Sequence, residues 1–338
     1  MRGEISLLTA ILCSGLIFAI ESTAQDHVVR STDSVQDHIL AATLIVGQDK
    51  TLPQTLLPNL IPIVTGGEPP RPAGPTAAAP TKAFDQLYYL GMNTVGSWAL
   101  VTSAGIIQFD SLDNTDEAQR IIEEGYKKLG LDPAQMKYLI ITHGHGDHYG
   151  GAKYLQEKYH PRVLMSGPDW DMVAQIPPSN NSHFGAPPTR DMDVTDGEKL
   201  TLGNTTVTLY LTPGHTPATV SAIIPVTDHG QPHLLSFWGG TGFPQNMEPS
   251  SKNGGLRQYK RSLERFIKIG EAAKVDGVIS NHADLDGSFD KAEEVQNQKP
   301  GYPNPWIIGQ SGYIREMMVI WEMTEAAISK VQQKESGK

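Results

Sequence analysis

The amino-acid sequence predicts an α/β protein, in which short buried strands alternate with helices. Short apolar runs end in glycine or polar loops, as at residues 138–141, and are typical of buried strands. Longer stretches place apolar residues at helical spacing and begin or end at capping residues. Glycine (33) and proline (24) are abundant in the 338 residues, which favours strands and turns over a helix bundle.

The composition limits the classes of partner. Hydrophobic residues make up 39% of the chain, enough for a substantial core, and the net charge is −10 from 27 basic and 37 acidic side chains. Because no long basic run is present, a nucleic-acid partner is not expected. We expect a soluble protein that acts on a small molecule.

The N-terminus has the pattern of a secretory signal peptide, assigned to residues 1–24. Arg2 precedes an apolar run at 5–20, and the small residues Ser22-Thr23-Ala24 fit cleavage after Ala24. The alternative is an uncleaved membrane anchor, although the run is short for a span. We expect a secreted or periplasmic protein without stable membrane association. Cleavage would remove Cys13, the single cysteine, so the mature chain would have neither disulfides nor a thiolate ligand.

Residues 25–83 are expected to precede the catalytic domain. Residues 25–65 are predicted to be poorly constrained, apart from a modest helical stripe between Val35 and Ile45 that ends at Gly47. Residues 66–82 are rich in proline, alanine and glycine, which indicates a linker or an extended surface arm. The catalytic domain is then residues 84–338.

Within this domain β-rich runs and capped amphipathic stretches follow one another. Asn114-Thr115-Asp116 caps a helix that Gly130 stops, and Gly150-Gly151 opens the next. Residues 171–195 are irregular and are read as a surface loop or a lid over a site. Strands are predicted at 86–90, 97–102, 105–109, 138–141, 163–165, 206–211, 234–238 and 277–280, and helices at 115–129, 152–159, 256–273 and 313–331.

Three of these strands lead into metal-ligand side chains. Ligands gather at strand ends in sheet proteins of this layout, so the three segments are expected to meet. A lone histidine is usually a surface or core residue, but a glycine-spaced HxHxDH cluster indicates a metal site. Residues 138–141 precede His143, His145, Asp147 and His148; residues 206–211 precede His215; and residues 277–280 precede His282.

The set divides into two sites. His143, His145 and His215 form a three-imidazole site of the kind that leaves an open position on catalytic zinc. Asp147, His148 and His282 form a second site, and two such ions lie about 3.5–4 Å apart in dinuclear hydrolases. Imidazole ligands favour zinc, with iron or manganese as alternatives, so two Zn²⁺ ions per chain are expected.

Asp110 is a further candidate, because it follows the strand at 105–109 directly. A carboxylate near a histidine cluster can orient an imidazole from the outer coordination shell. The alternative interpretation is an ordinary turn residue.

The cluster from His143 to His148, with His215 and His282 downstream, resembles the metallo-β-lactamase superfamily over roughly residues 84–325. The resemblance implies an αββα sandwich of two mixed β-sheets flanked by helices. The ligand set is most similar to that of subclass B3 metallo-β-lactamases, with three histidines at the first zinc and Asp-His-His at the second. Subclasses B1 and B2 place a cysteine in the second site, which the mature chain lacks.

The resemblance implies an antibiotic-resistance enzyme that opens the β-lactam amide with a zinc-bound hydroxide. Asp147 would then be the catalytic residue that ligates and orients the hydroxide. Glyoxalase-II-like and lactonase branches instead carry a bridging aspartate after a strand, where this chain has Gly239-Gly240-Thr241. Thr241 is expected to stand in for a serine that touches zinc-bound water, and Ser221 to contact a substrate carboxylate.

Two other hypotheses remain open. One is a di-zinc hydrolase of the same fold that acts on a lactone, a thioester or another amide, and the other is a non-catalytic metal-binding module. Aromatic candidates for lining the substrate groove are Trp98, Trp170, Phe184 and Phe243. Asn180 and Asn204 begin glycosylation sequons, which would be used only in a eukaryotic host.

Overall fold

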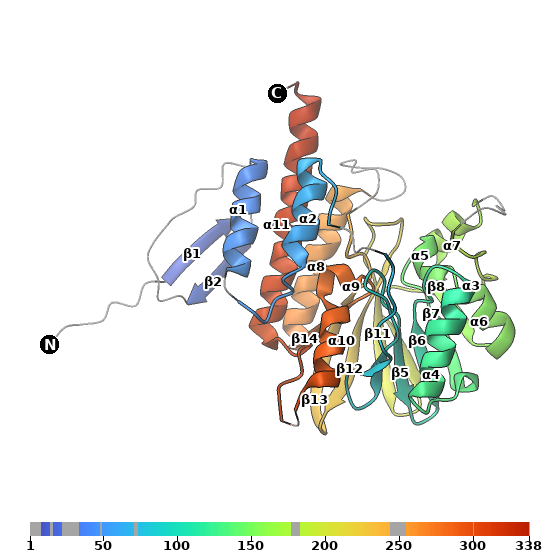
Figure 1. Ribbon diagram of the computed structural model, residues 1–338. Helices are drawn as coiled ribbons and strands as arrows, with labels where there is room; N and C mark the ends of the chain where they lie inside the picture. The colour runs from blue at the N-terminus through green and yellow to red at the C-terminus, as the bar shows by residue number, and fades with distance from the viewer. Residues whose placement is uncertain are drawn as a thin grey trace.

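Two stacked β-sheets lie between two layers of helices (Figure 1). The computed structural model describes residues 8–13, 16–21, 34–47, 49–70, 74–176, 183–243, 255–299 and 301–337. This four-layer arrangement is the αββα sandwich that the sequence predicts, and the prediction of fold class is confirmed.

The first sheet has seven strands in the order β3-β4-β5-β6-β7-β8-β9. The pairs from β6 to β9 are parallel and the remaining pairs are antiparallel, so the sheet is mixed. Its strands are β3 (Thr81–Lys82), β4 (Leu87–Tyr89), β5 (Trp98–Thr102), β6 (Gly105–Phe109), β7 (Met136–Ile140), β8 (Arg162–Ser166) and β9 (Met192–Val194).

The second sheet has five strands in chain order, and only its last pair, β13 with β14, is parallel. It is therefore also mixed. The sequence predicted its other strands but not β10 or β12. The strands are β10 (Glu198–Leu202), β11 (Thr205–Leu211), β12 (Val220–Asp228), β13 (Gln231–Trp238) and β14 (Gly277–Ser280).

Alternation along the strands divides the core into three layers. Ile107 and Phe109 of β6 face the second sheet, whereas Ile106, directly before them, packs against the outer helices. Phe109 meets Phe237 of β13 edge-on, with ring centroids 5.4 Å apart. The two sheets are thus joined by an apolar layer that stops at the strand ends, where the polar loops begin.

One helical layer covers the first sheet. Its first helix is continuous but contains a π-helical turn, and Asn114 caps it by accepting from the backbone N–H of Glu117. This confirms the predicted cap. The elements are α3 (Thr115–Glu117), η1 (Ala118–Glu123), α4 (Glu124–Lys128), η2 (Pro133–Gln135), α6 (Ala152–Tyr159) and α7 (Gly167–Val173).

The other helical layer covers the second sheet and includes two helices that precede the predicted catalytic domain (Figure 1). Helix α8 (Leu256–Ala273) and the long C-terminal helix α11 (Gly309–Glu335) pack together against this sheet. Two shorter helices, α9 (Ala283–Asp286) and α10 (Ser288–Asn297), follow β14. Helices α1 (Val35–Val46) and α2 (Leu56–Thr65) pack on α11.

Helix α1 confirms the helical stripe that was predicted from Val35 and expected to end at Gly47. The expectation that the rest of residues 25–65 is poorly constrained is wrong for residues 49–65. Leu56, Leu60 and Val64 of α2 are fully buried in the same cluster as the core of α11. His38 of α1 pairs with the buried Glu322 of α11, with 2.7 Å between Nδ1 and Oε2. The apolar face of α2 was missed because Pro58 and Pro62 interrupt its sequence pattern.

The remaining N-terminal segments are less extensive. Two short strands, β1 (Leu8–Cys13) and β2 (Leu16–Glu21), form an antiparallel hairpin within the predicted signal segment. The predicted cleavage site at residues 22–24 lies outside the described residues. Part of the proline-rich segment pairs with the first sheet, since Ala78 N–H donates to Gly91 and Thr81–Lys82 forms β3. Among the helices described, none has the length and apolar character needed to cross a bilayer.

Candidate metal centre

Three loops at one edge of the sandwich carry the predicted ligands. The first follows β7 and runs into a single helical turn, α5 (Gly146–Tyr149), which begins after His145. The second follows β11 and carries His215, and the third follows β14 and carries His282. Hydrogen bonds hold the loops together, because Val220 N–H donates to the carbonyl of Thr142 and Asn281 Nδ2 donates to Thr142 Oγ1.

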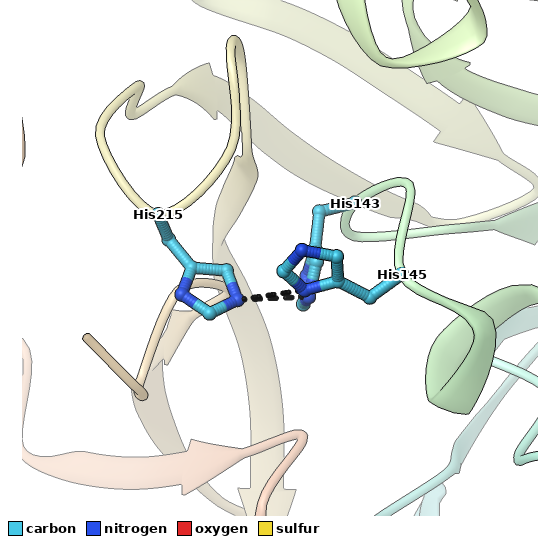
Figure 2. Close-up of side chains that lie close together, drawn as sticks. All are labelled: His143, His145 and His215. Atoms are coloured by element: carbon cyan, nitrogen blue, oxygen red, sulfur yellow. Dashed lines mark hydrogen bonds between the residues drawn. The ribbon is translucent and has the colours of Figure 1, made fainter. Parts of the chain in front are cut away.

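The first triad, His143, His145 and His215, converges on one point (Figure 2). Nε2 of His215 lies 3.1 Å from Nε2 of His143 and 3.1 Å from Nδ1 of His145. The three rings are nearly perpendicular to one another, so their nitrogen atoms point inward from different directions. Burial lowers the pKa of His145 to about 4 and holds the pKa of His143 and of His215 well below the usual value of an imidazole. All three imidazoles are therefore neutral and able to donate a lone pair at neutral pH.

The second triad is Asp147, His148 and His282. Asp147 Oδ2 lies 3.3 Å from Nε2 of His148 and 3.8 Å from Nε2 of His282. Burial opposes ionisation of Asp147, but the neighbouring His148 outweighs it and lowers the pKa of the carboxyl far below its usual range. Nε2 of His148 is buried and makes no hydrogen bond within the described part of the chain.

Both triads fit a divalent cation. Ligand atoms around a tetrahedral ion with bonds of about 2.1 Å lie about 3.4 Å apart, close to the separations in both triads. The buried, unbonded Nε2 of His148 is the kind of orphaned group that coordination would satisfy. Together, the two triads form one binuclear metal site.

Asp110 lies directly behind this site. Its Oδ1 accepts from Thr142 N–H at 2.7 Å, and its Oδ2 lies 2.8 Å from Thr142 Oγ1 and 2.9 Å from Nδ1 of His148. The carboxylate is fully buried, and it adopts a left-handed backbone conformation with φ of 54°. It thus fixes the His148 ring so that Nε2 faces Asp147.

A second buried carboxylate, Asp169, holds the first triad and was not singled out by sequence reasoning. Its oxygens accept from Gly144 N–H at 3.1 Å, Thr216 Oγ1 at 2.7 Å and Ala218 N–H at 3.1 Å. It therefore ties the loop of His143 to the loop of His215. Its position shortly after strand β8, at the same sheet edge as the histidine cluster, is the signal that could have found it.

The structure argues against the predicted substrate contacts of Ser221 and Thr241. Ser221 is fully buried, with its hydroxyl 2.6 Å from Thr212 Oγ1 and accepting from Gly239 N–H. Thr241 is 4% exposed, and its hydroxyl donates to the carbonyl of Trp238. Both hydroxyls are used to hold loops together and face no open surface.

Most of the predicted groove aromatics are also core residues. The indole N–H of Trp98 donates to Ser280 and that of Trp170 to Met192, and both side chains are buried, as is Phe243. Phe184 differs: it is 40% exposed and lies against Gly146, where a Cβ would sit 2.3 Å from its ring. Phe184 is thus the one predicted aromatic with exposed surface beside the metal centre. The predicted glycosylation site at Asn180 lies outside the described residues.

The comparisons agree with this architecture. Residues 98–229 match the family model of the metallo-beta-lactamase superfamily. This part of the chain is therefore similar to that superfamily. The predicted resemblance to this superfamily is thereby confirmed.

Two curated proteins are similar to parts of this chain. Glyoxylase B2 of Dictyostelium discoideum is 27% identical over 175 residues, which cover 48% of this chain and 54% of that protein. Hydroxyacylglutathione hydrolase GloC of Haemophilus influenzae is 30% identical over 118 residues, covering 33% and 53%. The chain thus spans about half the length of these curated relatives.

Among solved structures, BJP-1, a subclass B3 metallo-beta-lactamase of Bradyrhizobium japonicum, superposes with a TM-score of 0.58 at 23% identity. The match covers 78% of this chain and 94% of that enzyme. At this identity, the likeness establishes a shared fold.

Proposed function

We propose that the chain is a secreted di-zinc hydrolase that opens the amide bond of β-lactams, as subclass B3 enzymes do. The six residues of the two triads would hold the ions. When bound, the ions lower the pKa of water and supply positive charge for an oxyanion. The fold of BJP-1 supports the proposal, and one local observation carries it.

That observation is the pair of glycines after β13. A Cβ on Gly239 would lie 2.0 Å from the carbonyl oxygen of Val220, and a Cβ on Gly240 would lie 2.9 Å from the Cβ of His215. A side chain at Gly239 therefore clashes with the start of strand β12, and a side chain at Gly240 crowds His215. A bridging aspartate, as expected in glyoxalase-II-like enzymes, has no room there, which leaves Asp147 as the carboxylate of the two triads.

The protein groups around the triads set the state of each ligand. Gly242 carbonyl accepts from Nδ1 of His215 at 2.8 Å, which leaves Nε2 free to coordinate. Asp110 has the same effect on His148, and Asp147 remains an ionised carboxylate between His148 and His282. Asp147 is thus placed to accept a hydrogen bond from a nucleophilic water and to orient it.

The test is a substrate panel on the purified chain, after elemental analysis of its metal content. We expect two zinc ions per chain and turnover of a chromogenic cephalosporin that chelation abolishes and zinc restores. Finding iron or manganese in place of zinc would change the identity of the metal in the proposal and would leave the hydrolase function in place. Lactone turnover without cephalosporin turnover would overturn the β-lactam assignment while keeping the hydrolase. A tightly bound metal with no turnover of any panel member would favour a metal-binding module.

A second candidate is a thioester hydrolase, and the match to hydroxyacylglutathione hydrolase GloC favours it. The two candidates differ in the leaving group, which is a thiolate in a thioester and the ring nitrogen in a β-lactam. The same panel should therefore include an acylglutathione thioester. A kcat/KM for the thioester above that for the cephalosporin would replace the first candidate with the second.

Secretion and the domain division belong to the same proposal. We propose that residues 1–24 are removed, that residues 25–83 form an N-terminal extension and a linker rich in proline and alanine, and that residues 84–338 form the catalytic domain. N-terminal sequencing of the protein recovered from the periplasm should begin at Gln25. Recovery of the intact N-terminus from the membrane fraction would favour the anchor instead.

A further inference from the structure

We propose that Asp284 is the outer partner of His282 and that the N-terminal helix α2 holds it in position through Asn59. The inference rests on the proposed function in one respect, because the second triad must bind an ion. It assigns a role in metal binding to a segment outside the matched residues 98–229.

The first observation is that the histidines of the two triads differ in the partner of the ring nitrogen Nδ1. Nδ1 of His143 lies 3.1 Å from Thr142 Oγ1, Nδ1 of His148 lies 2.9 Å from Asp110, and Nδ1 of His215 lies 2.8 Å from a backbone carbonyl. Each of these rings is therefore fixed from behind. A metal-bound imidazole needs such a partner to keep its tautomer and orientation.

Among the described residues, one group stands in a comparable position at His282. Its Nδ1 lies 3.6 Å from Oδ1 of Asp284, while its Nε2 points towards Asp147 at 3.8 Å. The 3.6 Å separation is too long for a hydrogen bond, but that carboxylate oxygen is buried and has no hydrogen-bond partner among the described residues. A ring donor and an unsatisfied buried acceptor thus face each other, and a small rotation joins them.

The second observation concerns the helix that carries Asp284. Helix α9 is a single turn that follows directly on His282, so it cannot satisfy its own last carbonyl groups. Helix α2 supplies the missing donors: Asn59 Nδ2 donates to the carbonyl of Asp284 at 2.5 Å and Thr55 Oγ1 to that of Leu285 at 3.3 Å. The backbone that positions the carboxylate is therefore held by α2.

Helix α2 is itself a firm support. Its buried leucines pack in the same cluster as α8 and α11, and Asn59 is only 6% exposed. Asn59 also donates to Thr55 one turn earlier at 2.9 Å, which fixes the orientation of its amide. A path of direct contacts therefore runs from α2 through Asp284 to His282 and the second triad.

The experiment measures zinc affinity, independently of hydrolysis. The metal-stripped full chain is titrated with Zn²⁺ against a competing chelator, and the first and second equivalents are resolved. The variants are Asp284→Asn, Asn59→Leu and the double variant. The control is Thr65→Ala, also on α2, whose hydroxyl bonds only within its own helix.

We expect each single variant to weaken the second equivalent by about ten- to a hundredfold and to leave the first unchanged. The double variant should be close to Asp284→Asn alone, because both residues act on one contact. Unchanged second-site affinity in Asp284→Asn would overturn the proposal. The proposal would also be overturned if the losses of zinc affinity in the two single variants multiplied in the double variant. A third contrary result is an equal loss of affinity for both zinc equivalents together with a lower melting temperature.

The wild-type titration separates this proposal from the function on which it rests. If the wild-type chain takes up two equivalents, the variants alone decide whether Asp284 and Asn59 act on the second. If it takes up only one equivalent, the di-zinc function is overturned, and this proposal with it.

Discussion

The two triads are built from similar side chains but are supported in different ways. The first triad lies wholly within residues 98–229, and a single carboxylate, Asp169, ties its two loops together. The second triad takes His282 from outside that range, and its surroundings include the N-terminal helix α2. The first triad is thus a local product of the superfamily core, whereas the second depends on contacts between distant parts of the chain.

This difference teaches that ligand spacing and ligand support are separate problems. Six side chains at the ends of three strands suffice to bring the ligands together, because the sheet edge aligns them. The groups that fix the imidazoles come from elsewhere, and they differ between the two triads. Variants in the ligands and in their supports should therefore separate the two halves of the centre.

The largest expected effect is that of His145→Ala, which removes a ligand of the first triad. Hydrolysis should fall at least about a thousandfold, because the first ion loses one of three imidazoles. The melting temperature of the metal-free chain should change little. The control, His229→Ala, lies in an exposed turn and should retain full activity. Near wild-type turnover by His145→Ala would show that the first triad is misassigned.

The next prediction concerns the pH dependence of stability that is due to Glu316, a buried residue of helix α11 near Asp286 at the end of α9. Burial, opposed by Lys291 and reinforced by Asp286, raises the pKa of Glu316 to about 7. Because the unfolded glutamate titrates near 4.5, the folded state binds the extra proton between these values, and stability falls as pH rises through them.

The loss is on the order of 3 kcal/mol between pH 4.5 and pH 7. Glu316→Gln should flatten this slope in urea unfolding curves of the metal-free chain. An unchanged slope in the variant would assign the pH dependence to another group.

Asp110→Asn tests the support of the second triad from within the matched domain. Asparagine keeps the shape but replaces one acceptor oxygen with a donor, so it cannot serve both Thr142 and Nδ1 of His148. Activity should fall about ten- to a hundredfold, with zinc lost first from the second site. Asp116→Asn, an exposed carboxylate on α3, is the control. Zinc loss from the first site alone would contradict the assignment.

Asp169→Asn is the matching change at the first triad. The affinity of the first site for zinc should fall about tenfold, and that of the second should not change. The reason is that an amide has one acceptor oxygen, which cannot serve all three donors that now bond to the two oxygens of Asp169. Asp171→Asn on the same helix, whose side chain is exposed, should behave as wild type. If Asp169→Asn weakened the second site instead, the division into two separately supported halves would fail.

The sequence was sufficient for the ligands and for most strands because both depend on local pattern. Residues 105–109 and 256–273 have the spacing of a strand and a helix, and the structure has both within those bounds. The family and the four-layer fold followed from the histidine cluster, and the comparisons confirm both.

What the sequence could not provide was burial that depends on distant contacts. Helix α2 carries two prolines and no charged residue, so nothing in its local pattern indicated that it packs on α11. Asp169 is one of many aspartates, and only the approach of two loops to its carboxylate distinguishes it. Ser221 was predicted to contact the substrate because it follows His215 closely in the sequence, but strand β12 places it inside the protein.

Ser221→Ala is expected to have the smallest effect and tests this last correction. The Ser221 hydroxyl accepts from Gly239 N–H and bonds to Thr212, so its removal should lower the free energy of unfolding by about 1 kcal/mol. Ser236→Ala on the neighbouring strand β13 is the control, since the Ser236 hydroxyl is buried without a hydrogen bond among the described residues. KM should be unchanged in both variants. A raised KM for substrates that carry a carboxylate, and only in Ser221→Ala, would restore Ser221 as a substrate contact.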